Sequence, residues 1–305
     1  MELRSLQHED QKFTYSDHAE VFPTFATGIL REILAKWQHI FPREHTLIHS
    51  RHNVPSLFVR FDCVITSGQL RIYEVQEGCA WVGYTGVAND EFRKIRDEIV
   101  HGEWPRLKVL RADVQSDKDD DLWLERATIA EALESPDPLI VRFWPSRLSA
   151  EERNIIIGKS LRPVLHHNNK RYGIHFGWWK PAIWHESDHG ASLPWNEPFV
   201  LKPLSGHGSK DIMFWKPDDR TGRATRTQIV HTLQRHGKMY LQPFIPPMQT
   251  DINGVPYHFL YRPYFIYSGK RAEWVPAHGI WTARPYPNLR LHGASDAISG
   301  PLLME

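Results

Sequence analysis

The sequence predicts a mixed α/β protein, and three observations carry that prediction. Residues 60–76 have the pattern of a β-hairpin, because β-branched and aromatic residues flank a short Gly-containing turn at 67–69. Residues 26–40 place apolar side chains at helical spacing. Strand patterns at 106–112 and 138–144 alternate with helical ones, and this alternation is typical of mixed α/β folds.

Three helices can be located from their periodicity and their caps. The helix expected at 26–40 has an apolar stripe, which consists of Ile29, Leu30, Ile33, Leu34 and Trp37. A second helix is expected at 89–100, with Asn89 as its N-cap. A third begins after Ser149, which has capping-box spacing to Glu152, and Pro163 limits how far this helix extends.

The composition excludes several classes of protein. The 305 residues include 37 Lys and Arg against 36 Asp and Glu, a balance that argues against a duplex nucleic-acid binder. Cys63 and Cys79 are too few for a disulfide framework, so we expect reduced thiols. No segment resembles a secretory signal or reaches the roughly 20 apolar residues of a membrane helix. We therefore expect a soluble, cytoplasmic protein in which the acidic run at 117–121 is a solvated loop or helix start.

The hairpin at 60–76 gathers polar groups on one face. Side chains alternate along a strand, and the register that keeps the apolar residues together sets Asp62 opposite Glu74 and Arg60 opposite Gln76. Two facing carboxylates repel each other, so a positive charge is expected between them. Carboxylate and amide oxygens suit a hard cation such as Mg²⁺. The alternative is an exposed edge hairpin in which Arg60 neutralises Asp62 while Glu74 faces water.

A second informative segment is the strand and loop at 199–215. An apolar strand contains Lys202 and leads into a loop of small residues, which comprises Ser205, Gly206, His207, Gly208 and Ser209. Glycines let backbone N–H groups surround an anion, and a nearby lysine supplies a positive charge for phosphate. The spacing matches neither a P-loop nor a dinucleotide fingerprint, and an ordinary hairpin turn is the alternative.

The last third of the chain contains a hinge pattern and two further strands. Residues 239–247 form a short apolar strand broken by prolines. The strands that follow, YRPYFIYSGK and GIWTARPYPNLRLHG, place Arg262, Arg284 and Asn288 near strand ends.

Together these motifs resemble the nucleotide-binding half of the ATP-grasp enzymes. The resemblance rests on a KP strand with a glycine loop, a QPFI hinge, an RPYFIYSG strand and an ARPYPNLRLHG segment. The acidic RFD and YEVQ motifs precede the lysine strand, an order similar to the circularly permuted branch typified by the synthetase domain of glutathionylspermidine synthase. Gln76 stands at the asparagine of that branch, and Gly158-Lys159 resembles its Asn-Lys element.

The resemblance implies a single ATP-grasp catalytic unit over residues 1–305, circularly permuted, with two lobes enclosing a nucleotide cleft. Region 1–150 would contain the metal-binding hairpin at 58–78. Region 151–240 would form the lobe with the lysine and the glycine loop, and region 241–305 would supply the hinge and a phosphate-binding segment.

The resemblance also implies roles for individual residues. Asp62, Glu74 and Gln76 would hold Mg²⁺ against the phosphates of ATP, while Arg60 and Arg284 would act in catalysis. The nucleotide would be bound by a larger set, which consists of Lys159, Lys202, Ser205, Gly206, His207, Gly208, Ser209, Gln242, Phe244, Arg262 and Asn288.

The reaction implied by the resemblance is ATP-dependent amide formation. A carboxylate substrate takes the γ-phosphoryl group of ATP to give an acylphosphate and ADP, and an amine then displaces phosphate. We expect small-molecule substrates of the amino-acid, peptide or polyamine class, with no membrane or nucleic-acid partner.

Departures from the resembled pattern keep two other functions open. Gln76 replaces asparagine, and residues 206–208 stand where the resembled enzyme has an Arg-Glu pair beside its glycine. Such changes would suit a nucleotide-binding or scaffold protein without ligase activity. In the other alternative, aromatic and basic segments at 170–184 and 262–290 bind single-stranded nucleic acid, which the near-zero net charge disfavours.

Overall fold

The structure of the chain is a computed structural model. The residues that it describes are 1–8, 11–44, 57–77, 81–111, 118–141, 148–161, 180–183, 193–203, 211–217, 224–289 and 296–305. The chain divides into two compact units, which we describe one at a time. The first comprises Met1–Cys63, Gln76–Val164 and Gln249–Glu305, and the second comprises Val64–Val75 and Leu165–Met248.

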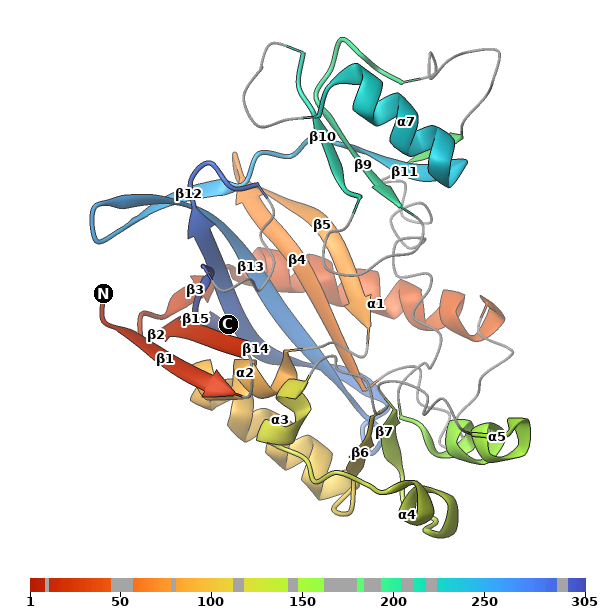
Figure 1. The fold of residues 1–305 in the computed structure, drawn as a ribbon. Helices are drawn as coiled ribbons and strands as arrows, with labels where there is room; N and C mark the ends of the chain where they lie inside the picture. The colour runs from red at the N-terminus through yellow and green to blue at the C-terminus, as the bar shows by residue number, and fades with distance from the viewer. Residues whose placement is uncertain are drawn as a thin grey trace. The chain divides into compact units, whose positions relative to one another are not determined.

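The larger sheet has nine described strands and is mixed (Figure 1). These strands are β1 (Leu3–His8), β2 (Gln11–Ser16), β3 (Glu20–Phe22), β4 (Phe58–Thr66), β5 (Gln69–Glu77), β12 (Met248–Ile252), β13 (Val255–Ser268), β14 (Glu273–Pro285) and β15 (Ile298–Met304). Their main order is β1-β2-β15-β14-β13-β4-β5, while β12 pairs with β13 and β3 pairs with β15. Strands β13 and β14 are antiparallel, whereas β15 runs parallel to β2 and β3. The mixed α/β class therefore agrees with the prediction.

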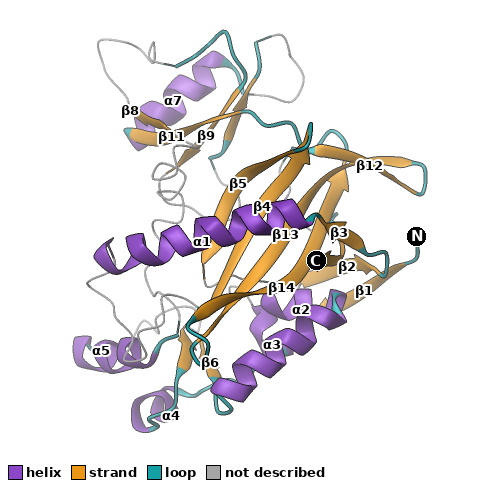
Figure 2. Ribbon diagram, turned by 180° about the vertical axis from the view of Figure 1, so that it is seen from behind, coloured by secondary structure: helices purple, strands orange, loops and turns teal. Residues whose placement is uncertain are grey.

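Helices cover the sheet of the first unit. Helix α1 (Thr24–Glu44) crosses one face of the larger sheet (Figure 2) and buries Leu30 and Leu34. Ile29, which the predicted stripe includes, is 40% exposed, so the stripe is wrong at that position. Helices α2 (Val82–Ala88) and α3 (Asp90–Glu103) pack against β13, β14 and β15.

The predicted helix caps are confirmed. The side chain of Asn89 accepts hydrogen bonds from the backbone N–H groups of Glu91 and Phe92, both at 3.1 Å, and so begins α3. Ser149 and Glu152 form the predicted capping box at the start of α5 (Ala150–Lys159).

A small parallel pair of strands lies beside these helices. The two strands are β6 (Lys108–Leu110) and β7 (Leu139–Val141), and each falls within a strand predicted from the sequence. Helix α4 (Ile129–Glu134) contributes the buried side chain of Ala132 to the apolar cluster around β7.

The acidic run at 117–121 differs from the expectation of a solvated segment. Its described part begins at Lys118 and forms a short 3-10 helix, η1 (Lys118–Leu122), in which Asp119 and Asp120 are buried. Asp119 Oδ2 accepts a hydrogen bond from the backbone N–H of Gly83 at 3.0 Å, and Asp120 Oδ1 accepts from Trp123 Nε1 at 3.3 Å. The expected helix start agrees with η1, whereas the expected solvation is wrong for Asp119 and Asp120. Helix α2 begins beside this run and supplies Asp119 with a donor that the local sequence does not reveal.

The second unit contains a sheet of four described strands in the order β10-β9-β11-β8. Besides most of β5, the elements of this unit are β8 (Lys180–Ile183), β9 (Phe199–Pro203), β10 (Met213–Trp215), β11 (Lys238–Pro243) and α7 (Arg226–His236). Leu201 and Met239 from the sheet pack against Ile229 and Leu233 of α7. Helix α7 therefore covers one face of this sheet.

None of the helices in the described ranges combines the length and the apolar character that a membrane crossing requires.

Candidate functional site

One face of the larger sheet carries several of the predicted polar residues. Arg60 on β4 pairs with Tyr264 on β13, so their side chains share a face, and alternation along the strands adds Asp62 and Arg262 to it. Arg60, Asp62 and Arg262 are only 3%, 7% and 2% exposed. The exposure assumed in the edge-hairpin alternative is therefore wrong for Arg60 and Asp62, while the ion pair that it expects between them is present.

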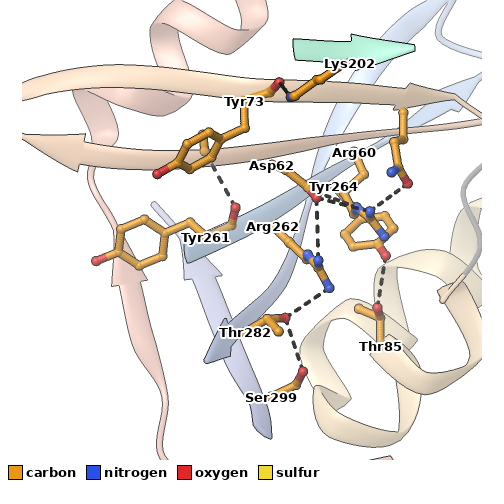
Figure 3. Close-up of polar contacts among 12 residues, drawn as sticks. Arg60, Asp62, Tyr73, Thr85, Lys202, Tyr261, Arg262, Tyr264, Thr282 and Ser299 are labelled. Atoms are coloured by element: carbon orange, nitrogen blue, oxygen red, sulfur yellow. Dashed lines mark hydrogen bonds and ion pairs between the residues drawn. The ribbon is translucent and has the colours of Figure 1, made fainter. Parts of the chain in front are cut away.

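These side chains form a connected polar cluster (Figure 3). Arg60 Nε donates to Asp62 Oδ1 at 2.8 Å, and Arg60 Nη2 donates to Gln76 Oε1 at 2.6 Å. Arg262 Nη2 lies 3.5 Å from Asp62 Oδ2. Two guanidinium groups from neighbouring strands thus converge on one carboxylate, which stabilises charges that would be costly to bury alone.

The hairpin that carries Asp62 closes with a tighter turn than the sequence predicts. Strand β5 begins at Gln69, so the turn consists of Ser67 and Gly68, both with positive φ (51° and 71°). Positive φ at two central residues is the pattern of a type I′ hairpin turn. Arg60 and Gln76 are joined through their side chains, and the predicted cross-strand register of the hairpin stays a prediction.

Aromatic and apolar groups surround the cluster. The guanidinium carbon of Arg60 lies 5.9 Å from the centroid of the Tyr264 ring, and the hydroxyl of Thr85 donates to the Tyr264 hydroxyl at 3.2 Å. Cys63, a free cysteine as expected, lies on the opposite face of β4, and burial raises the pKa of its thiol. The negative charge of Asp62 acts on that pKa in the same direction, so the thiol is neutral.

Two residues that sequence reasoning missed extend the cluster. Arg262 Nη1 donates to Thr282 Oγ1 at 3.2 Å, and this hydroxyl lies 3.2 Å from Ser299 Oγ (Figure 3). The available signal was the alternation of Thr282 with the predicted Arg284, because residues two apart on a strand share a face.

Arg284 and Asn288, also predicted, lie at and beyond the end of β14. Arg284 Nη2 is 2.6 Å from Asp296 Oδ1 and donates to Asp296 Oδ2 at 2.7 Å. The backbone oxygen of Asn288 is 2.8 Å from His258 Nδ1, and His258 pairs directly with Arg284 across the strands. Arg284 therefore shares the sheet face of Arg262 and Thr282.

In the second unit, the structure brings two predicted nucleotide residues to one face of the smaller sheet. Lys202 pairs with Tyr240 and Gln242 pairs with Val200, so both polar side chains point away from the face that α7 covers. Lys202 Nζ donates to the backbone oxygen of Tyr73 at 2.9 Å, and Gln242 Nε2 donates to that of Ile72 at 3.3 Å.

Phe244 lies directly after β11 in the same unit. Its backbone N–H donates to the oxygen of Pro198 at 3.1 Å, and its ring meets that of Phe214 edge to face at 6.4 Å between centroids. Glu74 is half-buried and also belongs to this unit. The pairing of Glu74 with Asp62 stays a prediction.

Lys159 is placed differently from the other predicted residues. Its ammonium donates to the backbone oxygens of Ala132, Leu133 and Ser135, at 2.8, 2.9 and 2.6 Å. These oxygens lie at the C-terminal end of α4, where carbonyl groups lack partners within the helix. The geometry gives Lys159 a capping role, and its assignment to the nucleotide stays a prediction.

The glycine loop, with Ser205, Gly206, His207, Gly208 and Ser209, lies outside the described residues.

The donor chemistry of the cluster suits Mg²⁺. Asp62 and Gln76 offer carboxylate and amide oxygens, which are ligands for hard cations. A carboxylate has about four lone-pair sites, and the two guanidinium groups make three contacts with Asp62, which leaves about one site for a cation. Across the described residues, no three His, Cys, Asp or Glu side chains gather into a metal cluster. The predicted magnesium ligands, Asp62, Glu74 and Gln76, include only two such side chains, because Gln76 is an amide.

Comparison with known proteins identifies two solved structures with partial likeness. A glutathione synthetase-like effector from Globodera pallida, in its apo form, shares 11% identity at a TM-score of 0.47, with 94% of this chain and 89% of that chain covered. A candidate gamma-glutamylcysteine synthetase from Methylobacillus flagellatus KT shares 13% identity at a TM-score of 0.44, with 86% and 82% covered. No protein-family model and no curated protein sequence matches the chain.

Proposed function

We propose that the protein is an ATP-dependent carboxylate-amine ligase of the ATP-grasp type, circularly permuted, that acts in the cytoplasm on small molecules. The observation that carries the proposal is the cluster formed by the buried residues Arg60, Asp62 and Arg262 with the half-buried Gln76. Buried charges are costly unless they are paired, and their concentration on one sheet face is typical of a functional site. Their order along the chain is the order that the sequence resemblance predicts.

In the proposed reaction, a carboxylate oxygen of the substrate attacks the γ-phosphorus of ATP and displaces ADP, which gives an acylphosphate. An amine nitrogen then attacks the acylphosphate carbonyl, loses a proton and displaces phosphate, which gives the amide. Lys202, the loop at 205–209 and Arg262 would bind the phosphates. Mg²⁺, held by Asp62, Glu74 and Gln76, would neutralise phosphate charge when bound. The role proposed for Arg60 is to stabilise negative charge at the reacting carbonyl.

A substrate screen tests the proposal directly. The intact chain is incubated with Mg-ATP and with pairs of amino acids, short peptides or polyamines, and released phosphate and ADP are measured. We expect ADP formation that requires both a carboxylate and an amine. Binding of Mg-ATP without ADP formation for any pair would contradict ligase activity.

Three substitutions separate the proposed roles. Glu74→Ala should lower the rate of ADP formation by at least about 100-fold while Mg-ATP still binds, because metal-assisted charge neutralisation is worth several kcal/mol in the transition state. Lys202→Ala should weaken Mg-ATP binding by about 10- to 100-fold, because it removes a charged donor to the phosphates. Gln76→Asn should retain turnover if an amide at this position ligates the metal. Titration calorimetry measures the affinity for Mg-ATP, and a phosphate-release assay measures turnover.

A matched control uses Glu98, an exposed glutamate on α3. Glu98→Ala should leave both Mg-ATP affinity and ADP formation at the level of the parent chain. Equal turnover for Glu74→Ala and Glu98→Ala would remove the metal centre from the proposal.

One observation favours a second candidate, a nucleotide-binding protein without ligase activity. Arg60 donates to both Asp62 and Gln76, which are two of the proposed metal ligands. A guanidinium in this position supplies the positive charge that the hairpin requires. In that case Mg²⁺ would not change the affinity for ATP, which calorimetry with and without EDTA would show.

A further inference from the structure

Two buried hydroxyl groups on β14 and β15 are connected to Arg262 by hydrogen bonds. Thr282 on β14 pairs directly with Ser299 on β15, so both side chains point to the face that carries Arg262. Thr282 and Ser299 are 0% and 1% exposed. A buried hydroxyl without a partner is costly, and each of these finds one within the chain.

The guanidinium of Arg262 is held at both of its terminal nitrogens. Nη1 donates to Thr282 Oγ1 at 3.2 Å, and Nη2 lies 3.5 Å from Asp62 Oδ2. A guanidinium is planar, so contacts at both nitrogens define the orientation of the whole group. Of these two contacts, the hydrogen bond to Thr282 is shorter than the ion pair with Asp62.

The structure also explains why a threonine is effective at this position. Threonine is β-branched and its χ1 angle is restricted, so Oγ1 occupies a well-defined place. Oγ1 accepts from Arg262, and it also shares a hydrogen bond of 3.2 Å with Ser299 Oγ, in which either hydroxyl can be the donor. Ser299 thereby orients Thr282, and Thr282 orients the arginine (Figure 3).

We propose that Thr282 and Ser299 are positioning residues that fix the guanidinium of Arg262 beside Asp62. Neither residue needs to touch a substrate. The consequence for phosphate binding rests on the proposed function, in which Arg262 binds the phosphates of ATP. A preorganised arginine binds phosphate better than a mobile one, because less conformational entropy is lost on binding.

The first experiment measures the arginine itself and needs no nucleotide. Nitrogen-15 spectra of arginine-labelled protein show separate Nη1 and Nη2 signals when rotation of a guanidinium is slow, and Arg262→Lys assigns those of Arg262. Thr282→Val removes the hydroxyl at nearly constant volume and should merge these two signals. Thr282→Ser keeps the hydroxyl and should preserve them, and Ser299→Ala should produce an intermediate change.

A matched control removes a buried serine hydroxyl elsewhere in the same sheet. Ser268 on β13 is 2% exposed, and its hydroxyl donates to Glu103 Oε1 at 2.6 Å. Ser268→Ala should leave the Arg262 signals unchanged, whatever it does to stability. Separate Arg262 signals in Thr282→Val, or an equal change in Ser268→Ala, would overturn the positioning role.

The second experiment measures Mg-ATP affinity by titration calorimetry. Thr282→Val should weaken binding by about 3- to 10-fold, the range expected for loss of one hydrogen bond, and Thr282→Ser should restore it. In the Arg262→Lys background, Thr282→Val should have no further effect, because the hydroxyl acts through the guanidinium. If the parent chain does not bind Mg-ATP, the proposed function fails, and the arginine spectra alone decide the positioning role.

Discussion

His278 occupies a point where β14 departs from regular strand geometry. Its φ is 62°, in the left-handed region, and the register between β13 and β14 shifts opposite it, between Pro263 and Phe265. The ring nitrogen Nδ1 accepts a hydrogen bond from the backbone N–H of Met304 at 2.9 Å. Only an imidazole that is unprotonated at Nδ1 can accept this bond, so the end of β15 depends on the neutral form.

The protonation of His278 predicts a pH dependence of stability. Burial lowers the pKa of His278, and the nearby charge of Glu91 opposes this shift without reversing it. The unfolded chain therefore binds more protons than the folded one below the ordinary histidine pKa of about 6.5. The stabilisation should be complete above that pH and should decline as the pH falls toward the lower folded pKa.

Urea unfolding at several pH values measures this effect. The difference in unfolding free energy between the parent chain and His278→Asn should shrink on acidification, because asparagine tolerates positive φ and does not titrate. His231, which lies on α7 in the other unit, provides the control His231→Asn. A difference for His278→Asn that is constant with pH would contradict the assignment.

At the scale of single residues, the sequence predicted the part of the site that alternation and charge reveal. Arg60 and Asp62 stand out because charged residues interrupt a β-branched strand, and both are buried in the cluster. Thr282 and Ser299 carry no charge, so neither stands out in the sequence. Alternation with Arg284 points to Thr282, and the register between β14 and β15 identifies Ser299. Lys159 was predicted from a two-residue resemblance, and the helix it caps is more than 20 positions earlier in the chain.

At the scale of elements, Lys159 joins α5 to the end of α4. Its replacement by methionine keeps the length of the side chain but leaves three carbonyl groups, one buried and two partly buried, without this donor. We expect Lys159→Met to lower the free energy of unfolding by about 2–4 kcal/mol, because unsatisfied buried polar groups are costly. We also expect it to leave Mg-ATP affinity unchanged.

Chemical denaturation and titration calorimetry measure the two quantities. The control Lys94→Met removes an exposed lysine of α3 whose ammonium pairs with Glu91, and it should change stability by less than about 1 kcal/mol. A large loss of Mg-ATP affinity in Lys159→Met, with stability preserved, would support the nucleotide role that the sequence resemblance predicts.

Local elements were predicted better than the contacts between them. The caps at Asn89 and Ser149 depend on residues two or three positions away, so a short window of sequence contains the whole motif. The acidic run at 117–121 contains no sign of its burial, because the N–H group that binds Asp119 belongs to Gly83. The turn at Ser67 was predicted one residue too long, since both two- and three-residue turns fit the same pattern.

At the scale of the whole molecule, the larger sheet joins strands from distant parts of the sequence. Strand β15, near the C-terminus, lies between β14 and β2 and also pairs with β3. Such pairings depend on loop closure over most of the chain and on side-chain fit between strands, neither of which a local pattern contains. No part of the sequence reading predicted them.

Trp281 shows how tightly these distant strands fit. It pairs with Gly300 across β14 and β15, and its ring is 1% exposed. The indole nitrogen donates to the backbone oxygen of His18, between β2 and β3, at 2.9 Å. A Cβ added at Gly300 would lie 2.6 Å from this nitrogen and still closer to two ring carbons, so a side chain at that position would displace the ring.

The substitution Gly300→Ala therefore tests the junction of the N-terminal and C-terminal strands. Displacement of the Trp281 ring should break its bond to His18 and lower the free energy of unfolding by about 1–3 kcal/mol, as overpacking does. Hydrogen exchange should increase in β2, β3 and β15 before it increases in α3. The control Gly102→Ala places a methyl group where nothing lies within 4 Å, and it should be neutral or slightly stabilising because alanine favours helix. Equal stability of Gly300→Ala and Gly102→Ala would show that the Trp281 ring can move without cost. The close packing of β14 on β15 would then contribute little to holding the N-terminal strands in the sheet.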